Sequence, residues 1–320
     1  MTTTRRTIIK AAFAAPALLG TRNAFAATPL SLQASWVNDA EFLGYFVAMD
    51  SKLYDKAGLA LNYIPGGPDV IPESTLLAGK ADIALTTPDT TIKAITDSGA
   101  QFRIIGAQYQ KNPLGVISLA KSNINKPADL VGKILAVPPV NTLSVNAMFK
   151  MNGIDPSSVK IVPYEYDPTP LIKGEVDATI DFATDVPFTI KQTGVEPASF
   201  LLYDYGFTIY NDTVVVTLDT LKTKRAALVK FLRASRAGWQ ENFKDPAAYP
   251  PKFANSYFQG TGRTTANDVY TNTADKPLID TPKGIFAMTE ADIAANIKAL
   301  ESIGIKAKRE YFDTSLLAEI

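Results

Sequence analysis

Residues 30–64 read LSLQASWVNDAEFLGYFVAMDSKLYDKAGLALNYI and contain a complete strand–helix–strand unit. Residues 30–35 have the pattern of a strand, and apolar residues between positions 42 and 53 recur at helical spacing. Asn38 and Glu41 resemble a capping box at the start of this helix, and Gly58 is placed to end it. Residues 59–64 have the pattern of a second strand. The unit predicts an α/β fold in which strands alternate with helices.

The same alternation continues along the chain. It predicts strands at 81–85, 102–107, 116–120, 134–137, 160–164, 176–182 and 214–218, and helices at 70–77, after Thr87-Pro88, and at 141–151, 223–243 and 290–303. The pattern restarts near Gly115, which indicates two similar halves with parallel sheets, followed by a helical C-terminal part. We therefore expect one lobe from residues 27–113 and 207–320, and a second from residues 114–206. Parallel sheets bind ligands at the carboxyl ends of their strands.

The composition narrows the possible functions. The 320 residues carry a formal net charge of +0, which gives no sign of binding to nucleic acid. The sequence has no cysteine, so disulfides, thiolate nucleophiles and Cys-ligated zinc or iron–sulfur sites are excluded. It also has no histidine, which excludes a Ser-His-Asp triad and His-ligated metals. We expect neither a metal nor a cofactor.

Residues 1–26 have the features of an export signal. Arg5-Arg6 is a twin arginine, a moderately apolar stretch follows, and Ala24-Phe25-Ala26 offers a small-x-small cleavage site. An apolar run of about a dozen residues is too short to span a bilayer. Cleavage after Ala26 would leave 28 basic residues against 32 acidic ones. The sequence therefore predicts a protein exported through a cleaved Tat-type signal to the periplasm.

The chain resembles the NMT1/THI5-like (SsuA/THI5-like) family of ABC transporter substrate-binding proteins over nearly all of residues 28–245. The resemblance rests on an ordered series of short motifs: WVNDAEFLGYFVA at 36–48, PGGP at 65–68, LAGKADI at 77–83, Tyr109-Gln110, GID at 153–155, PL at 170–171, VDA at 176–178, Asp204-Tyr205-Gly206 and Gly238-Trp239. It implies a type II periplasmic-binding-protein fold with two lobes around a ligand cleft, in which each lobe is a mixed or parallel sheet flanked by helices. It also implies a monomeric receptor that delivers a small aromatic N-heterocycle, such as a thiamine pyrimidine precursor or riboflavin, to a permease with an ATPase subunit.

The family also includes a synthase that makes the thiamine pyrimidine from its own histidine and bound pyridoxal phosphate. The resemblance places the Schiff-base lysine of that enzyme at Thr86 and its sacrificial histidine at Thr90. Because a Schiff base needs an amine, we expect this chain not to be an enzyme. A receptor that serves a sensor kinase is the second alternative, and the sequence does not separate it from a transport receptor.

Candidate ligand contacts lie in the motifs and at the ends of predicted strands. They are Trp36, Asn38, Glu41, Tyr45, Gly66, Thr87, Asp89, Tyr109, Gln110, Asn141, Thr142, Phe182, Thr184, Asp185, Asp204 and Tyr205. Trp36, Tyr109 and Phe182 offer aromatic faces for a flat ring, and the polar residues offer hydrogen bonds. Structural roles stay open for several of them: a core position for Trp36 or Tyr45, helix capping for Thr87, and hinge packing for Tyr109.

The predicted mechanism is ligand capture followed by closure of the two lobes. Residues 182–185 correspond to a family segment that often reads Tyr-x-Thr-Asn-Glu, and Phe182 and Val186 depart from it. No cluster of lysine or arginine stands near the motifs, and no carboxylate pair has catalytic spacing. A neutral or weakly charged aromatic ligand is therefore expected.

Overall fold

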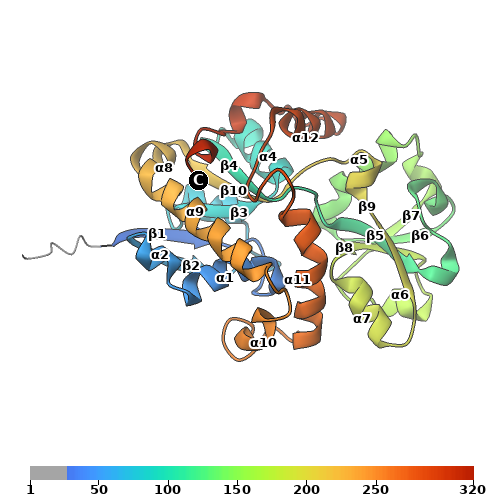
Figure 1. The fold of residues 1–320 in the computed structure, drawn as a ribbon. Helices are drawn as coiled ribbons and strands as arrows, with labels where there is room; N and C mark the ends of the chain where they lie inside the picture. The colour runs from blue at the N-terminus through green and yellow to red at the C-terminus, as the bar shows by residue number, and fades with distance from the viewer. Residues whose placement is uncertain (1–26) are drawn as a thin grey trace, which may run out of the picture.

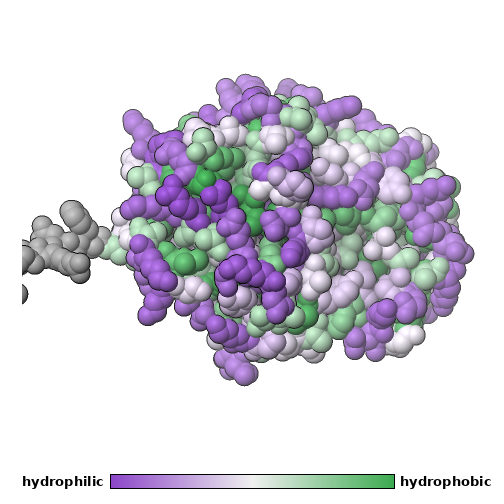
Figure 2. All heavy atoms as spheres, viewed as in Figure 1, coloured by the Kyte–Doolittle hydropathy of each residue, from purple (hydrophilic) through white to green (hydrophobic). Residues whose placement is uncertain are grey.

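The computed structural model describes residues 27–320, which form two α/β lobes side by side, each built around one five-stranded sheet (Figure 1). The export signal predicted for residues 1–26 lies outside the described residues. Within residues 27–320, no helix is long and apolar enough to cross a membrane. The visible face is largely hydrophilic, with smaller hydrophobic patches between the polar side chains (Figure 2).

The first sheet has the strand order β2-β1-β3-β10-β4. Its strands are β1 (Thr28–Gln33), β2 (Leu59–Ile64), β3 (Ile83–Thr86), β4 (Phe102–Tyr109) and β10 (Asn211–Thr217). Strand β1 pairs in parallel with both β2 and β3, as the strand–helix–strand pattern predicts. Strand β10 is antiparallel to its neighbours β3 and β4. The chain thus completes the first sheet only after it has formed the second.

The second sheet has the order β7-β6-β8-β5-β9. Its strands are β5 (Leu114–Leu119), β6 (Ile134–Val137), β7 (Lys160–Pro163), β8 (Ala178–Phe182) and β9 (Pro197–Leu201). Strand β6 is parallel to β7 and β8, whereas β5 is antiparallel to β8 and β9. Both sheets are mixed, which confirms the predicted lobes of mixed or parallel sheet and corrects only the purely parallel arrangement indicated by the alternation of strands and helices. The strands on either side of each crossover run antiparallel to their neighbours. Strand β9 was not predicted.

The helices flank the two sheets. They are α1 (Leu43–Asp50), α2 (Leu53–Lys56), α3 (Pro72–Leu77), α4 (Pro88–Ser98), α5 (Thr142–Met151), α6 (Thr169–Lys173), α7 (Val186–Gln192), α8 (Leu218–Thr223), α9 (Arg225–Asn242), α10 (Tyr249–Phe253), α11 (Thr265–Ile279) and α12 (Glu290–Ser302). Helix α9 packs against α1 beside the first sheet. Helix α11 contacts α7 as well as the 3-10 turn Ala40–Phe42 and β4, so it bridges the two lobes (Figure 1).

Two glycines allow α1 and α9 to cross closely. A Cβ atom on Gly44 would lie 2.1 Å from the Trp239 ring, and one on Gly238 would lie 2.2 Å from the Gly44 carbonyl oxygen. Trp239 is fully buried, with its ring stacked on Phe243 at 5.1 Å. The Gly44 and Gly238-Trp239 motifs are thus explained by helix packing.

The turn that precedes α1 is capped differently from the prediction. Asp39, and not Asn38, is the N-cap, since its carboxylate accepts a hydrogen bond of 2.9 Å from the Glu41 amide. Asn38 instead donates from Nδ2 to the Tyr257 carbonyl at 3.0 Å. The capping of this turn leaves the Glu41 side chain available for other contacts.

Candidate ligand-binding site

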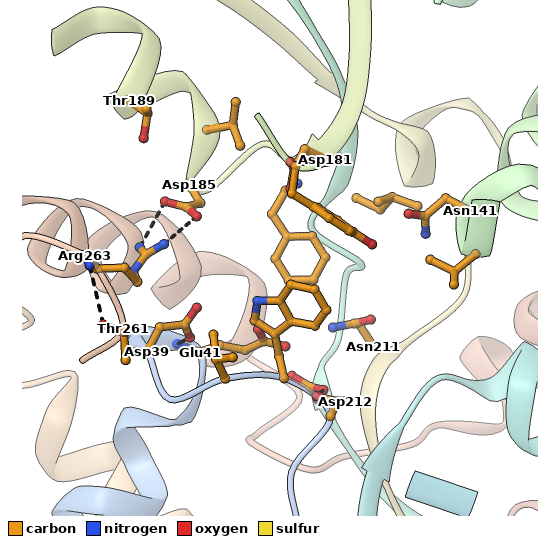
Figure 3. Close-up of a pocket in the computed structure, with 18 of the residues that line it drawn as sticks. Asp39, Glu41, Asn141, Asp181, Asp185, Thr189, Asn211, Asp212, Thr261 and Arg263 are labelled. Atoms are coloured by element: carbon orange, nitrogen blue, oxygen red, sulfur yellow. Dashed lines mark hydrogen bonds and ion pairs between the residues drawn. The ribbon is translucent and has the colours of Figure 1, made fainter. Parts of the chain in front are cut away.

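A cavity of about 450 Å³ lies between the two sheets (Figure 3). Its walls come from both lobes: Ser35, Trp36, Val37, Asp39, Glu41, Thr87, Leu114, Val140, Asn141, Tyr166, Pro168, Asp181, Phe182, Asp185, Val186, Thr189, Asn211, Asp212, Thr261 and Arg263. Ser35 and Trp36 follow β1, Thr87 follows β3, and Phe182 ends β8. The cavity therefore opens at the carboxyl ends of these three strands, where ligand sites of α/β sheets are found.

Aromatic side chains from both lobes line the cavity. The rings of Trp36, from the first lobe, and Tyr166, from the second, lie 5.2 Å apart with an interplanar angle of 54°. Phe182 contributes a third ring, which contacts the buried Tyr109 edge-on at 6.4 Å. Tyr166 has a φ angle of 59°, an uncommon conformation for a bulky residue. Such surfaces suit a flat, apolar ligand.

Glu41 and Asp212 form a buried pair of acids on the first-lobe wall. Asp212 accepts hydrogen bonds from Ser35 Oγ at 2.7 Å and from Gln108 Nε2 at 3.2 Å. Burial, together with the neighbouring Asp212, raises the pKa of Glu41 well above its usual range. Burial also raises the pKa of Asp212. Because two adjacent carboxylates repel each other, one proton shared by the pair is the favoured state.

Two more acids flank this pair. Burial is the main cause that raises the pKa of Asp39 to about 7, although the Arg263 guanidinium acts in the opposite direction. Burial likewise raises the pKa of Asp181 to about 7, against the effect of its hydrogen bond from the Phe182 amide. Both groups lie on the cavity, one from each lobe (Figure 3). The cavity wall therefore carries two carboxyl groups, one from each lobe, whose pKa values are raised to about 7.

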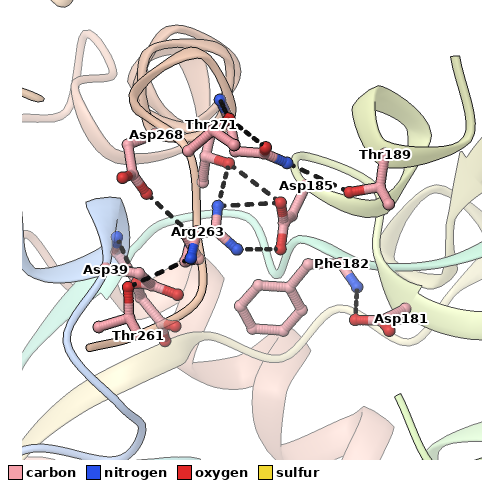
Figure 4. A network of polar contacts seen from close by, with 12 residues as sticks. Asp39, Asp181, Phe182, Asp185, Thr189, Thr261, Arg263, Asp268 and Thr271 are labelled. Carbon is pink, nitrogen blue, oxygen red and sulfur yellow. Dashed lines mark hydrogen bonds and ion pairs between the residues drawn. The ribbon is translucent and has the colours of Figure 1, made fainter. Parts of the chain in front are cut away.

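A network of polar contacts joins the lobes at one end of the cavity (Figure 4). Arg263, which precedes α11, donates to both oxygens of Asp185 at 2.7 and 3.0 Å and to Asp268 at 2.8 Å. Asn267 also donates to Thr189 of α7 at 3.2 Å. Asp185 and Thr189 belong to the second lobe. We call the Arg263–Asp185–Asp268 contacts the interlobe clasp, because they hold the two lobes together.

Some of the sequence-predicted residues lie on the cavity. These are Trp36, Glu41, Thr87, Asn141, Phe182 and Asp185. Thr87 is the N-cap residue of α4, but its side chain makes no capping hydrogen bond and contacts Thr90 Oγ1 instead. Asp185 forms the interlobe clasp and is thereby matched by a positive charge.

Several predicted residues are buried behind the walls. Tyr45 is fully buried beside Phe231 and Trp239, so it belongs to the core. Tyr109 is also fully buried, and Gln110 donates from Nε2 to the Ala107 carbonyl. Thr184 and Asp89 are likewise buried and do not line the cavity.

The other predicted residues lie outside the cavity. Gly66 approaches the backbone that leads to Trp36 so closely that a Cβ atom would lie 2.5 Å from the Ala34 carbonyl oxygen. Thr142 is exposed and donates to the Pro139 carbonyl. Asp204 forms an ion pair of 2.5 Å with Lys111, and with Tyr205 it lines a separate cavity between α5 and α12. Asn38 is held by the Tyr257 carbonyl, as described above.

Sequence reasoning missed five cavity residues that shape its chemistry: Asp39, Tyr166, Asp181, Asp212 and Arg263. Asp39 lies inside the quoted WVNDAEF motif, and its position next to a helix start was a usable signal. Asp181 is the penultimate residue of a correctly located strand. Tyr166, Asp212 and Arg263 stand in no motif, and only the fold brings them together.

The two mixed α/β lobes with a cavity between them define the periplasmic-binding-protein class of fold. The profile of the NMT1/THI5-like family matches residues 39–249, and the chain belongs to this family. A comparison with curated protein sequences gave no match.

Solved structures share the fold at low sequence identity. The periplasmic aliphatic sulphonate binding protein SsuA from Escherichia coli is 14% identical, with a TM-score of 0.65, over 86% of this chain and 91% of that one. The alkanesulfonate-binding protein SsuA from Xanthomonas axonopodis pv. citri, bound to MOPS, is 14% identical with a TM-score of 0.63, over 90% and 98%. The desulfurization enzyme DSZB is 12% identical with a TM-score of 0.57, over 91% and 98%. The fold therefore carries both binding proteins and an enzyme.

Proposed function

We propose that this chain is the periplasmic solute-binding protein of an ABC importer and encloses a small aromatic nitrogen heterocycle between its lobes. The observation that carries the proposal is the cavity between the two sheets, with aromatic rings from both lobes on its walls. Membership of the NMT1/THI5-like family supports the same function. The twin-arginine segment at residues 5–6 supports export to the periplasm.

Ligand capture in this proposal is a movement of one lobe against the other. The chain crosses between the sheets after β4 and before β10, so residues near 110–113 and 206–210 form the hinge. Residues 27–113 and 207–320 move as the first lobe, and residues 114–206 as the second. Closure brings Tyr166 against Trp36 and forms the interlobe clasp, which shields the ligand from water. The closed pair of lobes then docks on the permease.

The positions that correspond to the reactive residues of the synthase support binding without chemistry. Thr86 Oγ1 and Thr90 Oγ1 both donate hydrogen bonds to Glu73, the latter at 2.6 Å. These side chains form a structural network at the start of α4, and neither has an amine that could bind an aldehyde. Thr86 and Thr90 are not on the cavity wall.

A thermal-shift screen of residues 27–320 tests the proposal. The panel contains pyrimidine precursors, thiamine, riboflavin and other heterocycles. A ligand at a thousandfold excess over its Kd stabilises the protein by about 4 kcal/mol, and recovery of the unchanged compound supports a receptor. Stabilisation by pyridoxal phosphate with a new absorption band, and by no heterocycle, would contradict the proposal and indicate an enzyme.

A further inference from the structure

The cavity has an excess of acidic groups that no basic side chain neutralises. Its walls carry the carboxyl groups of Asp39, Glu41, Asp181, Asp185 and Asp212, and one guanidinium, that of Arg263. Asp185 is paired with Arg263. In the part of the chain that the structure describes, the remaining four acids form no salt bridge with lysine or arginine. Glu41 and Asp212, which share one proton, keep one negative charge between them, and no cation lies beside this pair. This charge faces the space that the ligand would fill.

Arg263 is not free to bind an anionic ligand. Its side chain already donates hydrogen bonds to Asp185, Asp268 and Thr271, and only 16% of it is exposed. These bonds also hold the lobes together, so a ligand anion that displaced them would weaken the clasp. The electrostatics of the cavity disfavour a sulfonate, a phosphate or a carboxylate group.

Glu41 is the best placed of the acids to bind a ligand directly. It is 6% exposed and lies on the cavity wall. Among residues 27–320, no N–H or hydroxyl group donates a hydrogen bond to its carboxyl group, whose polar neighbour is the acid Asp212. The only polar side-chain partner of Glu41 is therefore the proton that it shares with Asp212, which leaves the pair with one negative charge and no cation. An N–H group on the ligand would stabilise that buried charge.

The Asp212 backbone independently indicates a site under constraint. Its φ angle is 44°, in the left-handed region that non-glycine residues seldom adopt. The carboxyl group of Asp212 lies at the cavity, where it accepts the hydrogen bond from Ser35 (Figure 3). Tyr166 has the same kind of strain on the opposite wall. Local strain of this kind concentrates at ligand sites.

The surroundings favour an organic cation over a metal ion. No group of three or more acids within residues 27–320 has a geometry that could hold a metal. Trp36, Tyr166 and Phe182 instead offer ring faces, which attract positively charged nitrogen as well as flat apolar surfaces.

From this geometry we propose that the cavity selects a flat organic cation, whose positively charged N–H group donates hydrogen bonds to Glu41 and Asp212 while its ring lies among Trp36, Tyr166 and Phe182. This inference rests on the proposed receptor function and sharpens it. It replaces the neutral or weakly charged ligand expected from the sequence, because the acids that surround the cavity come together only in the fold.

Charge-matched probes test the inference on residues 27–320. Benzamidine, benzamide and benzoate have nearly the same shape, as do 2-naphthamidine, 2-naphthamide and 2-naphthoate, and each set contains a cation, a neutral amide and an anion. We expect an amidine to bind at least tenfold more tightly than the matched amide by isothermal titration calorimetry, and the carboxylate to bind most weakly.

The possible outcomes separate the two proposals. An amide or carboxylate that binds as tightly as its amidine would overturn the cationic ligand and leave the receptor function intact. Failure of both amidines to bind would also overturn it, whereas the receptor function fails only if the heterocycle screen is blank as well.

Variants locate the contact. Glu41→Gln and Asp212→Asn should each lower the affinity for the tighter amidine at least tenfold. Asp97→Asn, which removes an exposed ion pair with Lys93 within α4, should leave that affinity unchanged. Asparagine tolerates the backbone conformation of Asp212, and the melting temperatures of the unliganded variants report their folding. Equal affinity of the Glu41→Gln variant and the parent chain would contradict the assigned contact.

Discussion

Residues 36–41 and 43–48 are neighbours in the sequence but lie in different environments. The first stretch lies on the cavity, where it supplies Trp36, Asp39 and Glu41. The second forms α1, which is buried and packs against α9. Both belong to the WVNDAEFLGYFVA motif through which the family was identified. One motif can therefore serve both folding and binding. Its second half anchors α1 against α9, and the position of α1 in turn places the side chains of the first half at the cavity.

The two stretches also differ in what stabilises them. Helix α1 depends on close packing, since Gly44 leaves no room for a side chain beneath Trp239. The cavity stretch instead holds buried acids that destabilise the protein when ionised. Changes in α1 should therefore affect folding, whereas changes at the cavity should affect binding and the response to pH.

The largest expected effect comes from filling the α1–α9 contact. Gly44→Ala places a Cβ atom in the Trp239 ring and should lower the free energy of unfolding by more than about 3 kcal/mol. The matched control is Gly67→Ala, whose Cβ atom meets only Val37 at 3.9 Å. Urea denaturation measures the free energy of unfolding of both variants. Equal stability of the two variants would show that the helices separate easily.

Loss of the interlobe clasp should have the next largest effect. Arg263→Ala leaves the mostly buried Asp185 and Asp268 without their cation, and we expect a loss of about 3 kcal/mol in stability. Arg309→Ala removes an exposed bidentate pair with Glu290 and should change stability little. Urea denaturation compares them, and a similar loss in both variants would argue against the clasp.

The pH dependence of stability should reveal Asp39. Because its pKa is raised to about 7 in the folded state from 3.8, it favours the folded state at low pH. That contribution is lost as the pH rises from about 4 through 7. Asp39→Asn should therefore reduce the loss of stability between pH 5 and pH 8 by roughly 2 kcal/mol.

The control for this measurement is Asp155→Asn. Asp155 caps a 3-10 turn with the same 2.9 Å contact to a backbone amide, but it is exposed and its pKa is lowered by that contact. Its replacement should not flatten the pH profile. If the free energy of unfolding of Asp39→Asn falls with pH as steeply as that of the parent chain, Asp39 is ionised throughout this pH range.

The smallest expected effect is the loss of a stacking surface. Trp36→Ala should lower the affinity for the ligand found in the screen about tenfold, which corresponds to about 1.4 kcal/mol, and leave the fold unchanged. Tyr205→Ala, an aromatic residue outside the cavity, should leave affinity unchanged. Isothermal titration calorimetry measures the affinity of both variants. If Trp36→Ala binds the ligand as tightly as the parent chain, the ring of the ligand does not lie against Trp36.

Much of the fold was predictable from local patterns. The bounds of β2 and β6 match the predicted 59–64 and 134–137, because both strands are short apolar runs between clear turn signals. Helix α11 was missed because its sequence TANDVYTNTADKPLI is mainly polar and contains Pro277. It is nonetheless buried through polar residues, among them Asp268 and Asp275. A hydrophobic pattern does not detect a helix that buries its polar side.

The cavity was only partly predictable, for a related reason. Ser35 and Asp212 are hydrogen-bonded although 177 residues separate them, and Arg263 reaches Asp185 across 78. Such pairs depend on the order of strands in each sheet, which short-range spacing does not encode. Trp36 and Phe182 were accessible to sequence reasoning because they stand at the ends of well-marked strands.

The position of β10 has a consequence for biosynthesis. This strand lies between β3 and β4, so the first sheet has a vacant central place until residues 211–217 emerge from the ribosome. The second sheet, whose last strand ends at Leu201, can form earlier. During that interval β3 and β4 each have an unpaired edge, which is the kind of surface that promotes aggregation. A chaperone that binds the nascent chain would have most to protect between the synthesis of β4 and that of β10.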